Sequence, residues 1–136
     1  MAKRGEKVRC GNTMTEAQFV SFVKAALRGG SRRWKPISEC QRQARISRGL
    51  YRCASCEGEI PNSMVIDGKR KKAICIDHVN PTVGPTGFTT WDDFIEGLFA
   101  ELDNLQLLCV PCHKEKSSIE AAERAAHRKE KKANAK

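Results

Sequence analysis

The sequence has few aromatic residues and fewer acidic residues than basic ones. Aromatic residues make up 6% of the 136 positions, with a single tyrosine. Asp and Glu number 16 against 25 Lys and Arg, so the net charge is +9 at pH 7. This balance excludes an acidic disordered chain and makes a polyanion the first partner to consider.

Long apolar runs are also missing. No run approaches the roughly 18–20 residues that a membrane span needs. The charged start of the chain is not followed by the apolar stretch of a secretory signal. We therefore expect one domain, no membrane partner and a cytoplasmic location.

The seven cysteines are an odd number in a chain without an export signal, which disfavours disulfides. Four of them form two Cys-x-x-Cys pairs: Cys53, Cys56, Cys109 and Cys112. Two such turns can complete a tetrahedral sulfur cage, which predicts a structural zinc ion. The alternative is two redox pairs. The other three cysteines are expected to be small, partly apolar residues.

Charge is unevenly distributed along the chain. Residues 1–52 carry a net charge of +10, residues 53–103 carry −5 and residues 104–136 carry +4. The basic ends are typical of contacts with backbone phosphates. The acidic middle is expected either to hold a cation or to face away from the phosphates.

Periodicity predicts a mixture of helices and strands. Residues 1–13 are expected to be a flexible arm. Helices are predicted at about 15–30, where a capping box opens the helix and two glycines end it, and at about 36–47, with basic residues along one side. The remaining expected elements are a hairpin of 64–66 with 71–76, a loop at 80–90, a helix at 91–102, a strand at 105–108, and a helix from 111 that frays after about 128.

Three chemistry-bearing positions accompany the cysteine pairs. One strand ends in Asp77-His78, the next opens with Asn104, and His113 follows the second cysteine pair. His78 suits a general base because its usual pKa is close to neutral pH. Asp77 points to the other side of an extended strand, so it can bind a cation together with His113. Two protein ligands leave room for water and a phosphate oxygen, which suits Mg²⁺ or Mn²⁺.

The order Cys-x-x-Cys, Asp-His, Asn-Leu-x-x-Leu-Cys-x-x-Cys-His resembles the zinc-bound Cys₄ branch of the HNH endonucleases. The resemblance covers roughly residues 51–118. In size, the chain resembles the small standalone proteins of this type from phages and mobile elements. The resemblance implies an α+β fold in which a Cys₄ zinc site stabilises a ββα-metal motif. A helical, basic N-terminal extension precedes this motif. The resemblance also implies that His78 is the general base, that Asp77 and His113 are metal ligands, and that Asn104 holds the loop and orients the base.

These patterns predict a basic arm and helical extension at 1–50, a nuclease domain at 51–127 and a basic tail at 128–136. The expected function is metal-dependent hydrolysis of double-stranded DNA in a bacterial host or a phage-infected cell. The expected DNA contacts are Lys116, Arg32, Arg33, Lys35, Arg42, Arg45, Lys69 and Arg70.

Other interpretations stay open. The chain could be a non-catalytic zinc-binding module that binds DNA or serves as an adaptor for a protein partner. His113 could join the zinc site, and Asn104 could simply cap a turn. Trp34 could equally contact DNA or cover the core.

Overall fold

The computed structural model describes residues 5–135 of the chain. They belong to two compact units, Met1–Arg33 and Trp34–Lys136. Both units combine helices with small antiparallel sheets, so the predicted mixture of α and β structure is confirmed. Within residues 5–135, no helix has both the length and the apolar character needed to cross a bilayer.

The first unit contains a short hairpin and one helix. Strand β1 (Lys7–Arg9) pairs with β2 (Met14–Thr15), and α1 spans Glu16–Ser31. The predicted capping box between Thr15 and Gln18 is confirmed. The expectation of a flexible arm is wrong for residues 7–9, because the left-handed turn at 10–12 folds β1 back onto β2. Residues 1–4 of that expected arm lie outside the described residues.

In the second unit, helix α2 (Lys35–Ala44) is followed by a three-stranded sheet: β3 (Arg45–Ser47), β4 (Leu50–Arg52) and β5 (Glu59–Pro61). The helix predicted at about 36–47 therefore extends beyond the observed end of α2 at Ala44. Arg45 has extended backbone angles and pairs with Tyr51 of β4. The expected row of basic residues along one helix consequently breaks at Arg45.

The predicted hairpin around the Asp67-Gly68 turn is present, with different strand limits. Strand β6 (Ser63–Ile66) pairs with β7 (Lys69–Lys72), and β8 is a separate strand at Ile74–His78. The chain changes partners at Ala73, whose N–H bonds to Asn62 and whose carbonyl accepts from Val110. The strand expected at 71–76 is thus divided between two sheets.

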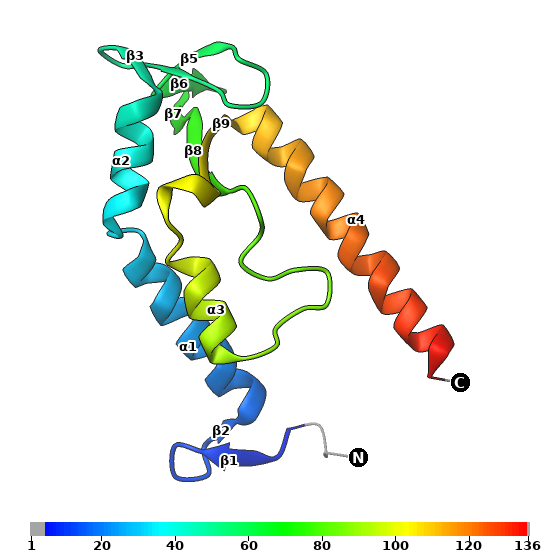
Figure 1. Cartoon of the computed structure of the whole chain (residues 1–136). Helices are drawn as coiled ribbons and strands as arrows, with labels where there is room; N and C mark the ends of the chain where they lie inside the picture. Colours follow the sequence, from blue (N-terminus) through cyan, green and yellow to red (C-terminus); the bar gives the residue numbers. More distant parts are fainter. Residues whose placement is uncertain (1–4, 136) are drawn as a thin grey trace. The chain divides into compact units, whose positions relative to one another are not determined.

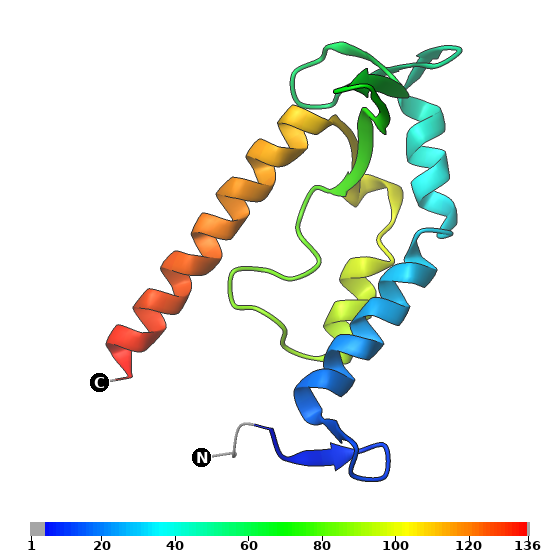
Figure 2. The ribbon, with the colours of Figure 1, turned by 180° about the vertical axis from the view of Figure 1, so that it is seen from behind.

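The centre of the second unit is a pair of strands with a helix on each side. Strand β8 pairs antiparallel with β9 (Leu105–Cys109), and β9 leads directly into α4 (Val110–Asn134). Helices α2 and α4 lie on opposite sides of this pair (Figures 1 and 2). Ile74, Leu107 and Leu108 are almost completely buried there. Helix α4 continues to Asn134, so the expected fraying from about residue 128 does not occur.

A long connection joins β8 to β9. It contains the predicted loop, helix α3 (Trp91–Leu98) and the short 3₁₀ helix η1 (Leu102–Asn104). Helix α3 ends earlier than predicted because Phe99 leaves the helical conformation. A Cβ atom at Gly97 would lie 3.1 Å from the carbonyl oxygen of Thr82. Glycine therefore lets α3 approach the preceding loop closely.

Candidate functional site

The four paired cysteines converge at one end of the β8–β9 pair. Their sulfur atoms all lie within 4.8 Å of one another, and the Sγ atoms of Cys56 and Cys109 are 3.9 Å apart. A tetrahedral zinc site with bonds of about 2.3 Å has sulfur–sulfur separations of about 3.8 Å. The cluster could therefore hold a metal ion such as zinc. Within residues 5–135 it is the sole group of three or more such ligand side chains, so His113 does not join it.

The local sequence explains how the first cysteine pair turns toward the second. Cys53 follows β4, and its backbone N–H bonds to the carbonyl of Gly58 at 3.0 Å. Glu57 adopts a positive φ of 59°, which closes the turn. The N–H of Ala54 bonds to Leu107 of β9 at 2.9 Å. These bonds fix the turn to the strand that delivers Cys109.

The thiols of the cluster differ in acidity. Burial disfavours the Cys53 thiolate, but backbone N–H groups of Cys109, Cys56 and Ser55 outweigh it and lower the pKa of Cys53 to about 6. The neighbouring Cys109 side chain, with burial, raises the pKa of Cys112 to about 12. A divalent cation would favour the thiolate form at all four positions.

The other cysteines fit the expectation of small, partly apolar residues. Burial raises the pKa of the Cys40 thiol and, together with the negative charge of Asp77, raises that of Cys75 to about 11. Cys75 lies against the carbonyl of Leu108 at 3.6 Å. Cys10 is exposed in the turn of the first unit.

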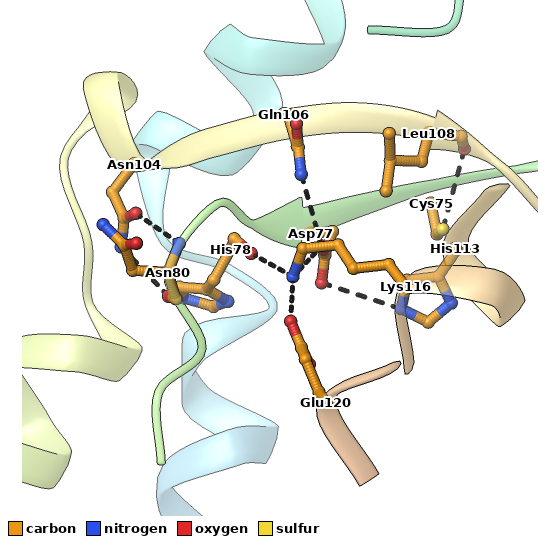
Figure 3. Close-up of polar contacts among 10 residues, drawn as sticks. All are labelled: Cys75, Asp77, His78, Asn80, Asn104, Gln106, Leu108, His113, Lys116 and Glu120. Carbon is orange, nitrogen blue, oxygen red and sulfur yellow. Dashed lines mark hydrogen bonds and ion pairs between the residues drawn. The ribbon is translucent and has the colours of Figure 1, made fainter. Parts of the chain in front are cut away.

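Asp77 sits near the end of β8 on the face that α4 covers. One carboxylate oxygen, Oδ1, lies 3.7 Å from Nε2 of His113, and the other, Oδ2, accepts from Lys116 Nζ at 2.9 Å (Figure 3). Gln106, directly opposite on β9, is 3.5 Å from Oδ2. The Asp77 carboxylate is 16% exposed. The structure thus brings together Asp77 and His113, the two predicted metal ligands, and pairs Asp77 with Lys116, which was predicted as a DNA contact.

Lys116 makes three internal contacts. Its ammonium donates to Asp77 Oδ2, to the backbone carbonyl of His78 at 2.9 Å and to the Glu120 carboxylate one helical turn later. Burial lowers the pKa of Lys116, but the bonds to Glu120 and Asp77 outweigh it, so the net shift is upward. Lys116 is therefore a firmly charged group that joins α4 to the end of β8.

His78 points away from Asp77, toward the end of α3. Its Nε2 lies 3.0 Å from the carbonyl oxygen of Leu98. A carbonyl oxygen can only accept, so Nε2 carries the hydrogen and Nδ1 of the neutral ring keeps its lone pair. The backbone contact thus selects the tautomer in which Nδ1 can accept a proton.

Asn104 is bonded to the residues that directly follow His78. Its Oδ1 accepts from the N–H of Asn80 at 2.8 Å, and its Nδ2 donates to the Asn80 carbonyl at 3.4 Å. Its backbone carbonyl also accepts from Val79 at 2.9 Å. Asn104 therefore connects the start of β9 to the chain leaving β8.

A groove of about 520 Å³ lies next to this network. Its wall includes Lys116 and Glu120 from α4, Gln106 from β9, and Val79 and Pro81 from the loop. A ligand bound there would therefore lie beside the Asp77 network.

The predicted DNA contacts lie on separate elements. Lys69 and Arg70 are exposed on β7, Lys35 and Arg42 lie on α2, and Arg45 is on β3, while Arg32 and Arg33 belong to the first unit. Four of the predicted DNA contacts have partners within the chain. Arg42 pairs with Glu39, and Arg45 Nε donates to the carbonyl of Ser47 at 3.2 Å. Arg70 donates to Ser63 Oγ at 2.9 Å, and Lys116 pairs with Asp77 and Glu120. Their predicted roles remain predictions.

Trp34 covers the core of the second unit. Its indole N–H donates to the carbonyl of Ala100 at 2.8 Å, and its ring meets Phe99 edge-on at 5.6 Å between centroids. Of the two interpretations left open by the sequence, this geometry supports the structural one.

Sequence reasoning missed three groups of the site: Glu120, Gln106 and the Leu98 carbonyl. The spacing of Lys116 and Glu120, four residues apart on a helix, was a usable signal. Gln106 could be found only from the β8–β9 register. The Leu98 carbonyl has no side-chain signal at all.

Comparisons of this chain with protein-family models, with curated proteins and with solved structures give no significant match.

Proposed function

We propose that this chain is a metal-dependent endonuclease of the HNH type that hydrolyses DNA phosphodiester bonds. The observation that carries the proposal is the arrangement at the end of β8. His78, with a lone pair on Nδ1, lies on one side, and Asp77, 3.7 Å from His113, lies on the other. Zinc in the cysteine cluster would have a structural role.

Asp77 and His113 fit a small divalent cation. In one octahedral ion with bonds of about 2.1 Å, adjacent ligands are separated by about 3.0 Å and opposite ligands by about 4.2 Å. The observed 3.7 Å between Asp77 Oδ1 and His113 Nε2 is longer than the adjacent separation by about 0.7 Å, so a small closing movement of the two side chains would let both bind one ion. Lys116 holds the other oxygen, Oδ2, and so leaves Oδ1 directed at His113. When bound, Mg²⁺ or Mn²⁺ would supply positive charge to the phosphate and to the leaving oxygen.

His78 would remove a proton from the attacking water through Nδ1. The imidazolium that forms would donate from Nε2 to the Leu98 carbonyl, which favours the charged ring and keeps its orientation. Asn104 would hold the backbone at Asn80 and thereby the exit of the chain from His78. Such a general base contributes typically 10²–10⁴-fold to the rate.

A second function is a non-catalytic zinc-dependent module that binds DNA or serves as an adaptor. A specific observation favours it: Asp77, Lys116 and Glu120 form an ion-pair network of their own. In that case Asp77 would fasten α4 to β8 and His78 would fasten β8 to α3.

The deciding experiment is conversion of supercoiled plasmid by zinc-loaded protein in Mg²⁺, Mn²⁺ or EDTA. We expect metal-dependent open-circle or linear product and a loss of at least about 100-fold in His78→Ala. His127→Ala, the same substitution in the middle of α4, is the matched control and should cleave normally. DNA binding with no cleavage in any metal would support the second function instead, and full cleavage by His78→Ala would refute His78 as the general base.

A further inference from the structure

The hairpin of β6 and β7 is a two-stranded ribbon with unusual side chains. Its turn, Asp67 and Gly68, has φ angles of 52° and 76°, which are typical of a tight two-residue hairpin. Within residues 5–135, the two strands form a sheet of their own. All four residues of β7 are basic and exposed.

Both faces of this ribbon carry positive charge. In an antiparallel pair, directly opposite residues point to the same face. The opposite pairs are Met64–Lys71 and Ile66–Lys69 on one face, and Ser63–Lys72 and Val65–Arg70 on the other. A hairpin that covers a core keeps one face apolar, whereas each face here has two cations. Val65 is 61% exposed, so the apolar residues of β6 are not covered either.

We propose that this ribbon enters the major groove of double-stranded DNA, an inference that rests on the proposed function and identifies how the substrate is held. The major groove is about 12 Å wide and admits a two-stranded ribbon. Phosphates line both walls of the groove, which matches cations on both faces of the ribbon. Met64 and Ile66, which share one exposed face, would face base edges, where thymine methyl groups offer apolar contacts.

The ribbon is connected to the candidate catalytic site by a short, ordered path. Strand β7 continues through Ala73 into β8, which ends at His78. The ten residues from the turn to His78 span at most about 33 Å at 3.3 Å per residue. This is close to one turn of B-DNA, about 34 Å. The ribbon can therefore occupy a groove within one helical turn of the phosphate that His78 would act on.

Duplex RNA is a poor match for the same surface. The major groove of an A-form helix is deep and too narrow for protein side chains to read. The ribbon should therefore contribute to binding of duplex DNA and not to binding of duplex RNA.

The test uses the zinc-loaded full chain in EDTA, so that cleavage does not enter the measurement. Two 30-base-pair DNA duplexes of one sequence are compared, one plain and one containing glucosylated hydroxymethylcytosine, whose sugar projects into the major groove. We expect the sugar to weaken binding by at least about tenfold. Replacing Lys69, Arg70, Lys71 and Lys72 with Gln should remove most of this difference. It should also make the negative slope of log binding constant against log salt concentration less steep by about 3–4.

A matched variant has the same charge loss in α4: Arg128, Lys129, Lys131 and Lys132 changed to Gln, all exposed in the structure. It should keep the full discrimination against the glucosylated duplex. Val65→Glu, a single change at an exposed position, serves if the fourfold ribbon variant does not fold by circular dichroism. It should weaken binding of plain DNA and leave binding of duplex RNA unchanged.

Equal binding of the two DNA duplexes by the natural chain would overturn the inference. The inference would also be overturned if the ribbon and helix variants lost the same share of the discrimination between the two DNA duplexes. It would be overturned as well if the ribbon variant lost as much affinity for duplex RNA as for plain duplex DNA. Cleavage of plasmid together with any of these results would leave the nuclease proposal standing. Discrimination between the two DNA duplexes without plasmid cleavage would support the ribbon inference and contradict the nuclease proposal.

Discussion

The cysteine cluster and the Asp77–His113 pair are two candidate metal sites that share helix α4, but they are built differently. The cluster provides four soft ligands whose sulfurs lie within 4.8 Å of one another. The second site provides two ligands and an ammonium group, and it borders a groove. The first is suited to closed coordination and the second to open coordination. The difference separates a site that can hold the fold from one that can exchange ligands.

Breaking the cluster should have the largest effect. Cys109→Ser, or removal of zinc with a strong chelator, should unfold much of the second unit, because structural zinc contributes about 10–16 kcal/mol in small modules. Thermal melting followed by circular dichroism, with zinc content measured in parallel, checks this. Cys10→Ser, in the first unit, is the control and should melt as the natural chain does. An unchanged melting temperature for Cys109→Ser would contradict a structural zinc ion.

Breaking the second site should abolish activity and spare the fold. His113→Ala should lose Mn²⁺ binding and reduce plasmid cleavage by about 100-fold or more, because one of two protein ligands is removed. Isothermal titration with Mn²⁺ on zinc-loaded protein measures the first effect. Zinc content and melting temperature should stay the same, since His113 lies outside the cluster. Loss of zinc in this variant would show that the two sites are not separate.

Lys116→Met sharpens the comparison by removing the group that holds Asp77 Oδ2. Groups that orient a metal ligand typically contribute 10–100-fold to metal affinity. We expect Mn²⁺ affinity to fall about tenfold, with zinc unchanged. Lys116→Arg keeps the charge and should lose less. Tighter Mn²⁺ binding by Lys116→Met would show instead that the ammonium competes with the cation.

The smallest effect is expected at Asn104. Asn104→Ala removes two exposed bonds to the backbone of Asn80 and should cost about 1 kcal/mol of stability. Urea unfolding measures this. Asn104→Asp keeps the oxygen that accepts from the Asn80 N–H and should recover part of the loss. No difference between the two variants would mean that this contact does not hold the loop.

Local patterns predicted most of the elements of this fold. The capping box at Thr15, the turn at Asp67-Gly68 and the convergence of the four cysteines all depend on spacing over a few residues or on ligand chemistry. Predicted element limits were wrong where a distant partner decides them. Arg45 leaves its helix to pair with Tyr51, and Ala73 divides one expected strand between two sheets.

The features of the candidate site also fall into two groups, those that local patterns predicted and those that distant partners determine. Asp77, His78 and His113 could be chosen from residue chemistry and order along the chain. The contact between His78 and the Leu98 carbonyl could not, because it joins a ring to a backbone atom 20 residues away. The pairing of Asp77 with Gln106 needed the strand register.

Helix α4 begins with adjacent residues that serve different centres: Cys112 faces the cluster and His113 faces Asp77. One residue corresponds to a rotation of about 100° around a helix axis. A single inserted or deleted residue between positions 109 and 116 would therefore turn one set of ligands away from its partners. The loop at 80–90 carries no such phase requirement. Length variation among homologous chains should concentrate in that loop and be absent from the first two turns of α4.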